Sequence, residues 1–450
     1  MTIIQSRRVY TDEGLKPAGI SVRNGIIQEI LPYQELKNGS ENGISDFEND
    51  VIIPGLIDPH IHINEPGRAD WEGFESATKA AAAGGITLLA DMPLNSSPVT
   101  TSAEALQLKT ESSANKLNVD CTFYGGAIPG NEAEIAKLAE AGVPGIKVFL
   151  CDSGLDEFPA VGEMELQTIM PVLAGFGLPL LVHAELTDDT ISPNSDFTLY
   201  QNYADTRPDH FEINAIEMMI RLCRETGCRV HIVHVATAKG TKLIKEAKRE
   251  GLPLTCETAP HYLYFTSETI QNGKTTFKCA PPLRDQKNRD GLIQGLLDGT
   301  IDFIGTDHSP CPPELKSMDS GNFYTAWGGI SSLQLLLPAL WTSVKDHGAD
   351  VTDIVKWTSS EPAKFLGLDH KTGFIREGYE ANLTVWDPDS EFTVKASDLY
   401  HKHKITPYDG EKLAGIVKSV FLRGQQVFDG SEFKHNTGKT IFKTERMLNE

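Results

Sequence analysis

The chain has 450 residues, 40% of them hydrophobic, and a formal net charge of −21 at pH 7. This length and hydrophobic content are sufficient for one large α/β domain with a smaller companion. Because the charge is strongly negative and no dense block of Lys and Arg interrupts it, nucleic acids and anionic membrane surfaces are excluded as partners.

The N-terminal residues, MTIIQSRRVYTDEG, contain no apolar run followed by a cleavage site and do not predict a secretion signal. The longest uncharged stretch, residues 167–184, is interrupted by prolines and glycines, which favours a helix, a turn and a strand over a membrane span. The seven cysteines are scattered without a CxxC pair and predict neither disulfides nor a thiolate zinc site. We therefore expect a cytoplasmic protein.

The two ends of the chain, residues 1–53 and 368–450, differ from the middle in their pattern of apolar and polar residues. They carry short alternating runs, such as GISVRNGIIQEI, ANLTVWDP and GIVKSVFLRGQQVFDG, separated by Gly, Asn and Asp. This pattern is typical of β-hairpins. We expect both ends to combine into one small β domain.

Between the ends, residues 54–367 are expected to form the main domain. Eight apolar runs of strand length recur, most of them followed by a helical stretch: VIIPGLIDPHIHI, GITLLADMP, VDCTFYGGAI, GIKVFLC, LPLLVHAE, RVHIVHVA, LPLTCETAPHYLYF and DFIGTDHSP. NEAEIAKLAEA and KGTKLIKEAKREG are two of the helical stretches. Near-continuous apolar strands that alternate with helices predict an α/β fold with a parallel (β/α)8 barrel, and a doubly wound open sheet is the alternative.

Titratable residues lie at the C-terminal ends of five of the eight runs. They are His60 and His62 on the first, Lys147 on the fourth, His183 on the fifth, His234 on the sixth and Asp307 on the eighth. In a parallel barrel these strand ends meet at one face. Because side chains two residues apart on a strand share a face, the first two histidines can bind one metal ion. An isolated HxH is equally typical of an exposed strand pair, so the other candidate ligands decide in favour of metal.

Other histidines are weaker candidates. His231 lies three residues before His234, so only one of them can face the barrel centre, and His231 is expected to be packed or at the surface. A second HxH, His401 and His403, is flanked by lysines and is expected in a solvated loop. His261 has no place in the ligand set and is expected to have a supporting or structural role.

Lys147 is the unusual member of the set, since an ammonium repels cations. Burial beside metal ions favours the neutral amine, which takes up carbon dioxide to form a carbamate with two oxygens. The six residues therefore predict two divalent ions: His60 and His62 on one, His183 and His234 on the other, and carbamylated Lys147 between them. Asp307 completes the set and is expected to transfer a proton during amide hydrolysis.

The motifs VIIPGLIDPHIH, GIKVFLC, VHAE, HVAT, ETAPHYL, GTDHSP and GYEANLTVWDP resemble those of the cyclic amidohydrolases of the amidohydrolase superfamily, over nearly the whole chain. The resemblance implies a (β/α)8 barrel, a β-sandwich from both termini, two metal ions bridged by carboxylated Lys147, and hydrolysis of a ring amide. It also implies a homotetramer. Zn²⁺ is the expected metal, with Co²⁺, Mn²⁺ or Fe²⁺ as alternatives.

Within this family, dihydroorotases carry an arginine two residues past the HxH, where it suits a carboxylate substrate. Here the position is Asn64. HINEPGR, DMPLNS, KCAPPLR, DHSPCPPELK and WGGISSLQ resemble the allantoinases of the family. The implied reaction opens (S)-allantoin to allantoate in purine catabolism. A hydantoinase or dihydropyrimidinase and a non-catalytic scaffold are the alternatives.

Substrate contacts are expected from Asn64 and Asn95, whose amides offer both donors and acceptors to a neutral ring, although either residue suits a turn equally well. The resemblance also places Ser153 where related enzymes polarise the scissile carbonyl. Asp58 is expected to orient a ligand histidine or the strand end. Arg68 is expected either to reach the site or to pair with an acid such as Asp70 or Glu72.

Overall fold

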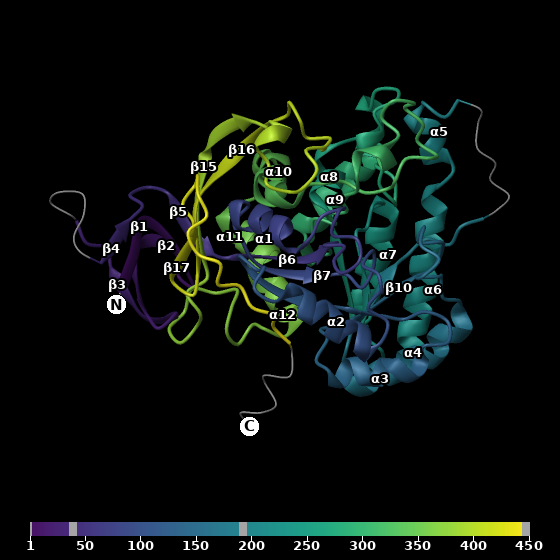
Figure 1. Cartoon of the computed structure of the whole chain (residues 1–450), viewed down its shortest axis with the longest axis horizontal. Helices are drawn as coiled ribbons and strands as arrows, with labels where there is room; N and C mark the ends of the chain where they lie inside the picture. The colour runs from purple at the N-terminus through teal and green to yellow at the C-terminus, as the bar shows by residue number, and fades with distance from the viewer. Residues whose placement is uncertain (1, 36–42, 189–195, 443–450) are drawn as a thin grey trace.

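The computed structural model describes residues 2–35, 43–188 and 196–442 of the chain (Figure 1). It has two parts: a barrel surrounded by helices, and a β domain on one side of it. None of the helices in these three ranges combines the length and hydrophobicity needed to traverse a lipid bilayer. All seven cysteines are buried free thiols, as their spacing predicts.

The barrel strands correspond to the eight predicted runs. They are β6 (Leu56–Ile61), β7 (Ile86–Asp91), β8 (Asp120–Phe123), β9 (Gly125–Gly126), β10 (Ile146–Phe149), β11 (Leu180–His183), β12 (Val230–Ile232), β13 (Leu254–Thr258) and β14 (Phe303–Ile304). The third run forms both β8 and β9, because the N–H of Tyr124 turns to the carbonyl of Asp91 on β7, at 3.0 Å.

Parallel pairing joins β6 to β8 through β7, and β9 to β14 in sequence order. A parallel bridge between Ile61 and His308 then joins the first strand to the segment after the last. The sheet therefore closes on itself, which confirms the predicted barrel and excludes the open doubly wound sheet.

Helices cover the outside of the barrel. They are α1 (Phe74–Ala83), α2 (Ala103–Ser113), α3 (Glu132–Glu140), α4 (Glu163–Phe176), α5 (Tyr200–Asp205), α6 (Asp209–Thr226), α7 (Ala238–Arg249), α8 (Pro260–Tyr264), α9 (Gln286–Leu297), α10 (Leu336–Val344), α11 (Val351–Val355) and α12 (Glu361–Leu366). Helix α7 shows why they form: the Thr237 hydroxyl caps the N–H of Gly240, and Thr241, Ile244 and Ala247 are buried at helical spacing.

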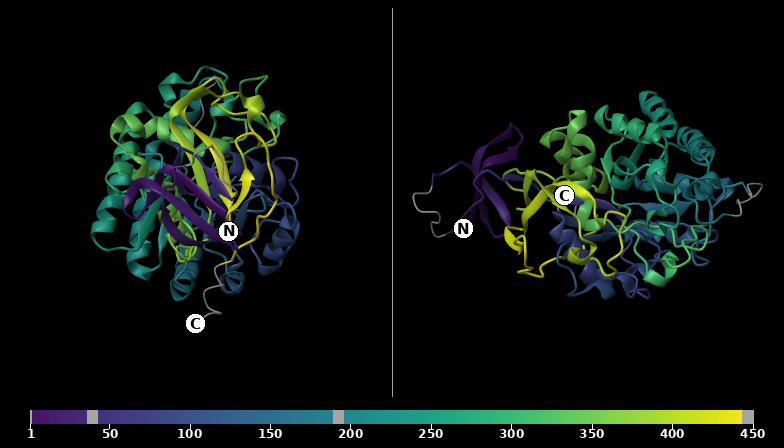
Figure 2. Two further views of the ribbon diagram at one scale, coloured as in Figure 1. Left: turned by 90° about the vertical axis from the view of Figure 1, so that its left-hand side faces the viewer. Right: turned by 90° about the horizontal axis from the view of Figure 1, so that it is seen from above.

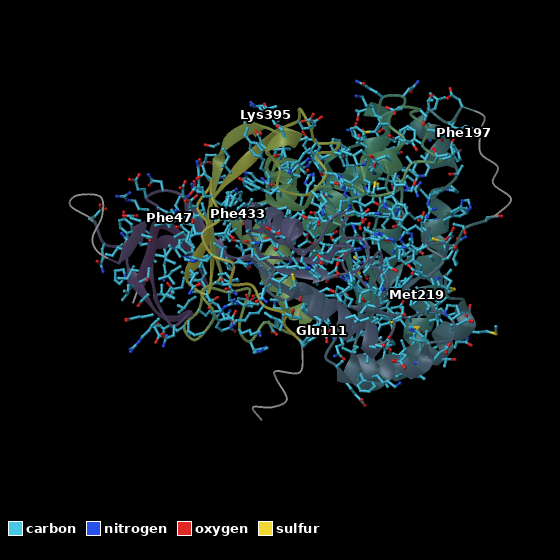
Figure 3. All side chains as sticks on the ribbon, in the orientation of Figure 1. Phe47, Glu111, Phe197, Met219, Lys395 and Phe433 are labelled. Carbon is cyan, nitrogen blue, oxygen red and sulfur yellow. The ribbon has the colours of Figure 1, made fainter. Side chains whose placement is uncertain are left out.

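The N-terminal end of the barrel is filled by apolar side chains. Ile57, Leu181 and Phe303, from three barrel strands, pack in one cluster with Phe365 of α12. Side chains crowd the space enclosed by the strands and helices (Figure 3). The interior of the barrel at this end is therefore a packed core.

The terminal β domain draws on both ends of the chain, as predicted. Its strands are β1 (Thr2–Thr11), β2 (Gly14–Arg23), β3 (Ile26–Pro32), β4 (Ile44–Asp46), β5 (Val51–Pro54), β15 (Leu383–Thr393), β16 (Lys412–Leu422) and β17 (Gln425–Phe428). They form one hydrogen-bonded sheet in the order β17-β16-β15-β5-β1-β2-β3, with β4 beside β1. Figure 2 shows the N-terminal strands (purple) and C-terminal strands (yellow) in this common unit. The boundaries after residues 53 and 367 stay a prediction.

Candidate metal centre

The six predicted ligands meet at the C-terminal end of the barrel, and each is at least nine-tenths buried. His60 lies on β6, Lys147 on β10 and His183 at the end of β11, whereas His62, His234 and Asp307 lie just past β6, β12 and β14. All six line one small cavity of about 80 Å³. The parallel barrel thus brings together residues from five separate segments of the chain.

The first group consists of His60, His62 and Asp307. The Nε2 atoms of both histidines lie 3.4 Å from Oδ1 of Asp307. The N–H of Asp307 donates to the carbonyl of His60 at 2.9 Å, and Asp307 has a positive φ of 46°. This backbone turn aims its carboxylate at the two rings.

The second group consists of His183 and His234. Nδ1 of His183 lies 3.0 Å from Nε2 of His234, and the His183 ring stacks on Phe149 with centroids 4.4 Å apart. The His60 and His234 rings are 5.4 Å apart, so the two groups adjoin. Burial lowers the pKa of His183 to about 4, which leaves a neutral imidazole with a lone pair available at neutral pH.

Lys147 lines the same cavity, and its amine is not hydrogen-bonded to any described residue. Nζ is buried and makes no hydrogen bond within the described residues, and it sits 5.0 Å from the centre of the Phe149 ring. Burial lowers the pKa of Lys147 to about 7, although Asp307 and Glu257 oppose the shift. At physiological pH, Lys147 is therefore a neutral amine in a substantial fraction of the protein molecules. The neutral amine is the form that reacts with carbon dioxide.

Three of the four candidate ligand histidines have a ring nitrogen held by an acceptor, whereas Nδ1 of His234 has no partner among the described residues. Nδ1 of His60 contacts the Glu257 carboxylate, and Nδ1 of His62 contacts the Leu94 carbonyl at 3.0 Å. Nε2 of His183 contacts Glu185 at 2.8 Å. Ligand histidines show this arrangement, in which one nitrogen is fixed by an acceptor and the other is free for a cation.

The donor set fits divalent metal ions. Two clusters of possible ligands emerge from the geometry, His60 with His62 and Asp307, and His183 with Cys151 and Glu185. Imidazole nitrogens and carboxylate oxygens suit zinc and its first-row neighbours. The unpaired amine of Lys147 and the histidines of both groups line the same cavity.

A model of the amidohydrolase family matches residues 51–427, which is most of the chain. The chain belongs to the amidohydrolase family. It is 43% identical to an allantoinase of Streptomyces avermitilis over 98% of this chain and 98% of that protein. It is 43% identical to an allantoinase of Arabidopsis thaliana over 96% of this chain and 88% of that protein. It is 39% identical to an allantoinase of Saccharomyces cerevisiae over 98% of this chain and 99% of that protein.

Solved structures show the same fold for this amidohydrolase. An L-hydantoinase (dihydropyrimidinase) from Arthrobacter aurescens superposes with a TM-score of 0.89 at 29% identity, covering 98% of this chain and 100% of that one. A crystal structure of D-hydantoinase gives a TM-score of 0.86 at 26% identity, covering 98% of both.

Two carboxylates of the amidohydrolase site escaped sequence analysis. Glu257 on β13 contacts His60, and the Glu257 pKa is lowered to about 2: burial raises it, but His60 and His231 outweigh burial. Glu185, two residues past His183, also accepts from Arg207, with Oε1 3.2 Å from Nε. The sequence feature that could have identified Glu257 and Glu185 is an acidic residue within or directly after an apolar run of strand length.

The predicted substrate contacts occupy different positions. Asn95 and Ser153 line the cavity beside the candidate ligands. Asn64 is buried with a positive φ of 68°, and its Nδ2 donates to the carbonyl of Pro310 at 3.3 Å. Ser153 donates to the Phe158 carbonyl at 2.7 Å. The contact of all three with substrate stays a prediction.

Asp58 holds the strand end, one of its two expected roles. It accepts from the N–H groups of His60 and Thr306, at 3.2 and 3.0 Å. Arg68 pairs with a loop acid, one of its two expected roles, although that acid is Glu157 rather than Asp70 or Glu72. Its guanidinium donates to the carbonyl of Asn95 at 2.7 Å and to Glu157 at 3.0 Å.

The four other histidines considered from the sequence do not line the cavity. His231 is fully buried and stacks on Phe303 with centroids 5.0 Å apart, as expected of a packed residue. His261 is also fully buried. The solvated-loop prediction was wrong for His401, which is 0% exposed because its loop packs against His308, with ring centroids 5.6 Å apart. His403 is half-buried and contacts the Asp70 carbonyl at 2.7 Å.

Proposed function

We propose that this amidohydrolase opens the hydantoin ring of allantoin by hydrolysis of its cyclic amide, which yields allantoate. The observation that carries the proposal is the six-residue cluster at the barrel mouth, in a chain 43% identical to a bacterial allantoinase over 98% of its length. The reaction consumes water, breaks one C–N bond and produces a carboxylate.

We assign His60, His62 and Asp307 to one divalent ion, and His183 and His234 to a second. Lys147 would bridge them as a carbamate: its neutral Nζ bonds to the carbon of CO₂ and releases one proton. Two ions held there would supply Lewis-acid activation of a water molecule and of the scissile carbonyl. Zn²⁺ is the metal we propose first, because imidazole and carboxylate donors suit it.

Asp307 is the proposed proton carrier. Its carboxylate lies at the cavity and accepts from the Ser309 hydroxyl at 3.0 Å on Oδ1. Burial raises the Asp307 pKa, but His60, His62 and His234 outweigh burial and hold it well below its usual range. Asp307 is therefore an acceptor at neutral pH. It takes the proton of the attacking water and returns it to the leaving ring nitrogen.

The proposed substrate contacts are amides and a hydroxyl, which match a neutral, amide-rich ring. Asn95 and Ser153 line the cavity, and Trp327, Gly328 and Gly329 form another part of its wall. Asn64, which is 1% exposed, is the third proposed substrate contact. We further propose the (S) enantiomer as substrate, a homotetramer as the assembly, the cytoplasm as the compartment, and domain boundaries after residues 53 and 367.

A substrate panel on metal-quantified protein tests the proposal. Allantoin should be hydrolysed much faster than hydantoin, dihydrouracil or dihydroorotate, with release of one carboxylate per ring opened. Faster turnover of hydantoin or dihydrouracil would assign the chain to the alternative activity. Protein that binds no metal and opens none of the four rings would be a scaffold of the same fold.

A further inference from the structure

Two lysines outside the ligand set, Lys316 buried and Lys278 partly buried, converge on one segment of the cavity wall. Lys278 Nζ donates to the carbonyls of Tyr324 and Ala326, at 3.2 and 2.6 Å. Lys316 Nζ donates to the carbonyl of Trp327 at 3.0 Å and to that of Gly329. We call residues 324–329 the wall segment, because Trp327, Gly328 and Gly329 line the cavity.

Neither lysine has a counter-ion. Among the described residues, the charged neighbours of the two amines include no carboxylate, and Lys316 is 3% exposed. Lys278 lies over the ring of Tyr203, 5.1 Å from its centroid. Burial lowers the pKa of both amines, to about 7 for Lys278, because no carboxylate of the described residues compensates the desolvation of the charged form. An apolar side chain of similar size would avoid the cost of burying an amine here. Two such lysines on one short segment therefore indicate that the position of that segment matters for function.

The wall segment lies against the proposed proton carrier. A Cβ on Gly329 would come within 2.3 Å of the Ser309 carbonyl, so the two backbones are in close contact there. The Ser309 hydroxyl in turn donates to Asp307 at 3.0 Å. A shift of the wall segment would therefore alter the cavity next to Asp307.

The side chain that the wall segment presents is Trp327. Its indole Nε1 is buried, and it donates to no acceptor in the part of the chain that the structure describes. Its ring packs edge-on against Trp71, with centroids 4.8 Å apart, and Gly154 leaves room beside it. A buried indole N–H normally finds a partner, so this donor is available to a bound molecule.

We propose that Lys278 and Lys316 are positioning residues for substrate binding, and that the Trp327 indole N–H they hold at the cavity donates to a carbonyl oxygen of the substrate. The proposal rests on the proposed function, since allantoin carries a ureido carbonyl beyond its ring that can accept this bond. It also gives one role to three sequence motifs: KCAPPLR supplies Lys278, PPELK supplies Lys316 and WGG supplies the wall.

Steady-state kinetics of Lys278→Met, Lys316→Met and Trp327→Phe test the proposal. Each variant should keep its metal content and a kcat within about threefold of wild type, whereas KM for allantoin should rise about tenfold, as loss of one substrate hydrogen bond requires. KM for hydantoin, which lacks the ureido arm, should change by less than about threefold. The matched control is Lys248→Met, because Lys248 donates to the Thr300 carbonyl at 2.7 Å away from the cavity.

Unchanged KM in both lysine variants, with normal metal content, would overturn the positioning role. Unchanged KM in Trp327→Phe would overturn the indole contact. If Lys316→Met does not fold, the comparison of Lys278→Met with Lys278→Arg tests the positioning role. Arginine keeps a cationic donor, so Lys278→Arg should restore the KM for allantoin. An equal KM in those two variants would contradict the proposal. Failure of the proposed function is separate, since wild-type protein would then not hydrolyse allantoin.

Discussion

Nδ1 of His183 and Nε2 of His234 face each other at 3.0 Å across the mouth of the barrel. Burial lowers the pKa of both rings, to about 4 for His183, so both are neutral at physiological pH. The outward nitrogen of His183 is held by Glu185 at 2.8 Å. Two neutral imidazoles fixed this closely are suited to share one cation.

This relationship predicts the effect of Glu185→Gln. The amide cannot accept as strongly from His183, and it leaves Arg207 without its carboxylate. We expect metal affinity or turnover to fall about 10- to 100-fold while the fold is retained. Metal titration followed by kinetics measures this. Glu163→Gln, which removes an exposed partner of Arg221, is the control and should change neither quantity.

Lys147→Ala should abolish the bridge between the two ions. Alanine provides no amine for a carbamate, so the variant should lose metal and nearly all turnover. A short carboxylic acid, such as propionate, should partly restore both by filling the vacated space. The control is Lys137→Ala on the surface of α3, where the side chain is 59% exposed. A Lys147→Ala variant with two metals and full turnover would disprove the bridging role.

The pKa of Lys147 near 7 predicts how metal-free protein recovers. Only the neutral amine reacts with CO₂, so at a fixed concentration of dissolved CO₂ the rate of reactivation by metal should rise about tenfold per pH unit below pH 7 and level off above it. The lowered pKa of Lys147 also affects the stability of the metal-free protein. Between about pH 7 and 10.5 the unfolded chain binds more protons at this lysine than the folded chain does. The free energy of unfolding should therefore increase as pH rises through that window. A pH-independent reactivation rate would contradict the assignment.

Asp307→Asn should keep the fold and at least one metal ion but lose proton transfer. We expect turnover to fall by at least about 10²- to 10⁴-fold across neutral pH. Asp302→Asn is a matched control from the other end of the same run, where Asp302 pairs with Lys248 at 2.6 Å. That variant should lose thermal stability and keep its turnover. Near-normal activity of Asp307→Asn would remove this residue from the reaction.

Asn64→Arg tests the preference for a neutral ring. A guanidinium placed beside two cations without a carboxylate partner is bulky and unpaired, so allantoin turnover should fall more than dihydroorotate turnover rises. Asn64 has a positive φ of 68°, so Asn64→Gly separates the backbone from the amide. Kinetics of both variants on the two substrates measure the effect. A wild-type preference for dihydroorotate would exclude the proposed substrate.

The barrel and the positions of the six candidate ligands could be predicted because both follow from local pattern. Strand ends are visible as polar residues after apolar runs, and parallel strands bring those ends together. The partners of the ligands could not be predicted in the same way. Glu257 contacts His60 only because β13 lies two positions from β6 around a closed barrel, and nothing near either residue in the sequence indicates that pairing.

His401 shows the opposite difficulty. Its flanking lysines indicate solvent, and Lys402 is indeed exposed. However, the N–H of Lys402 donates to Glu72 at 3.1 Å, which draws the loop onto the barrel and buries the histidine between its neighbours. A contact between residues so far apart in the chain has no local signature. The flanking charges therefore predict the exposure of Lys402 correctly and that of His401 wrongly.

The bridge between Ile61 and His308 joins the first barrel strand to the segment that follows the last, and the first group of candidate ligands lies across this seam. A cation bound by His60, His62 and Asp307 would act as a reversible cross-link between segments from opposite ends of the barrel sequence. Such a link restricts the unfolded chain much as a long-range disulfide does. Removal of the metal should therefore increase amide hydrogen exchange first along this seam, well before the helices on the far side of the barrel lose protection.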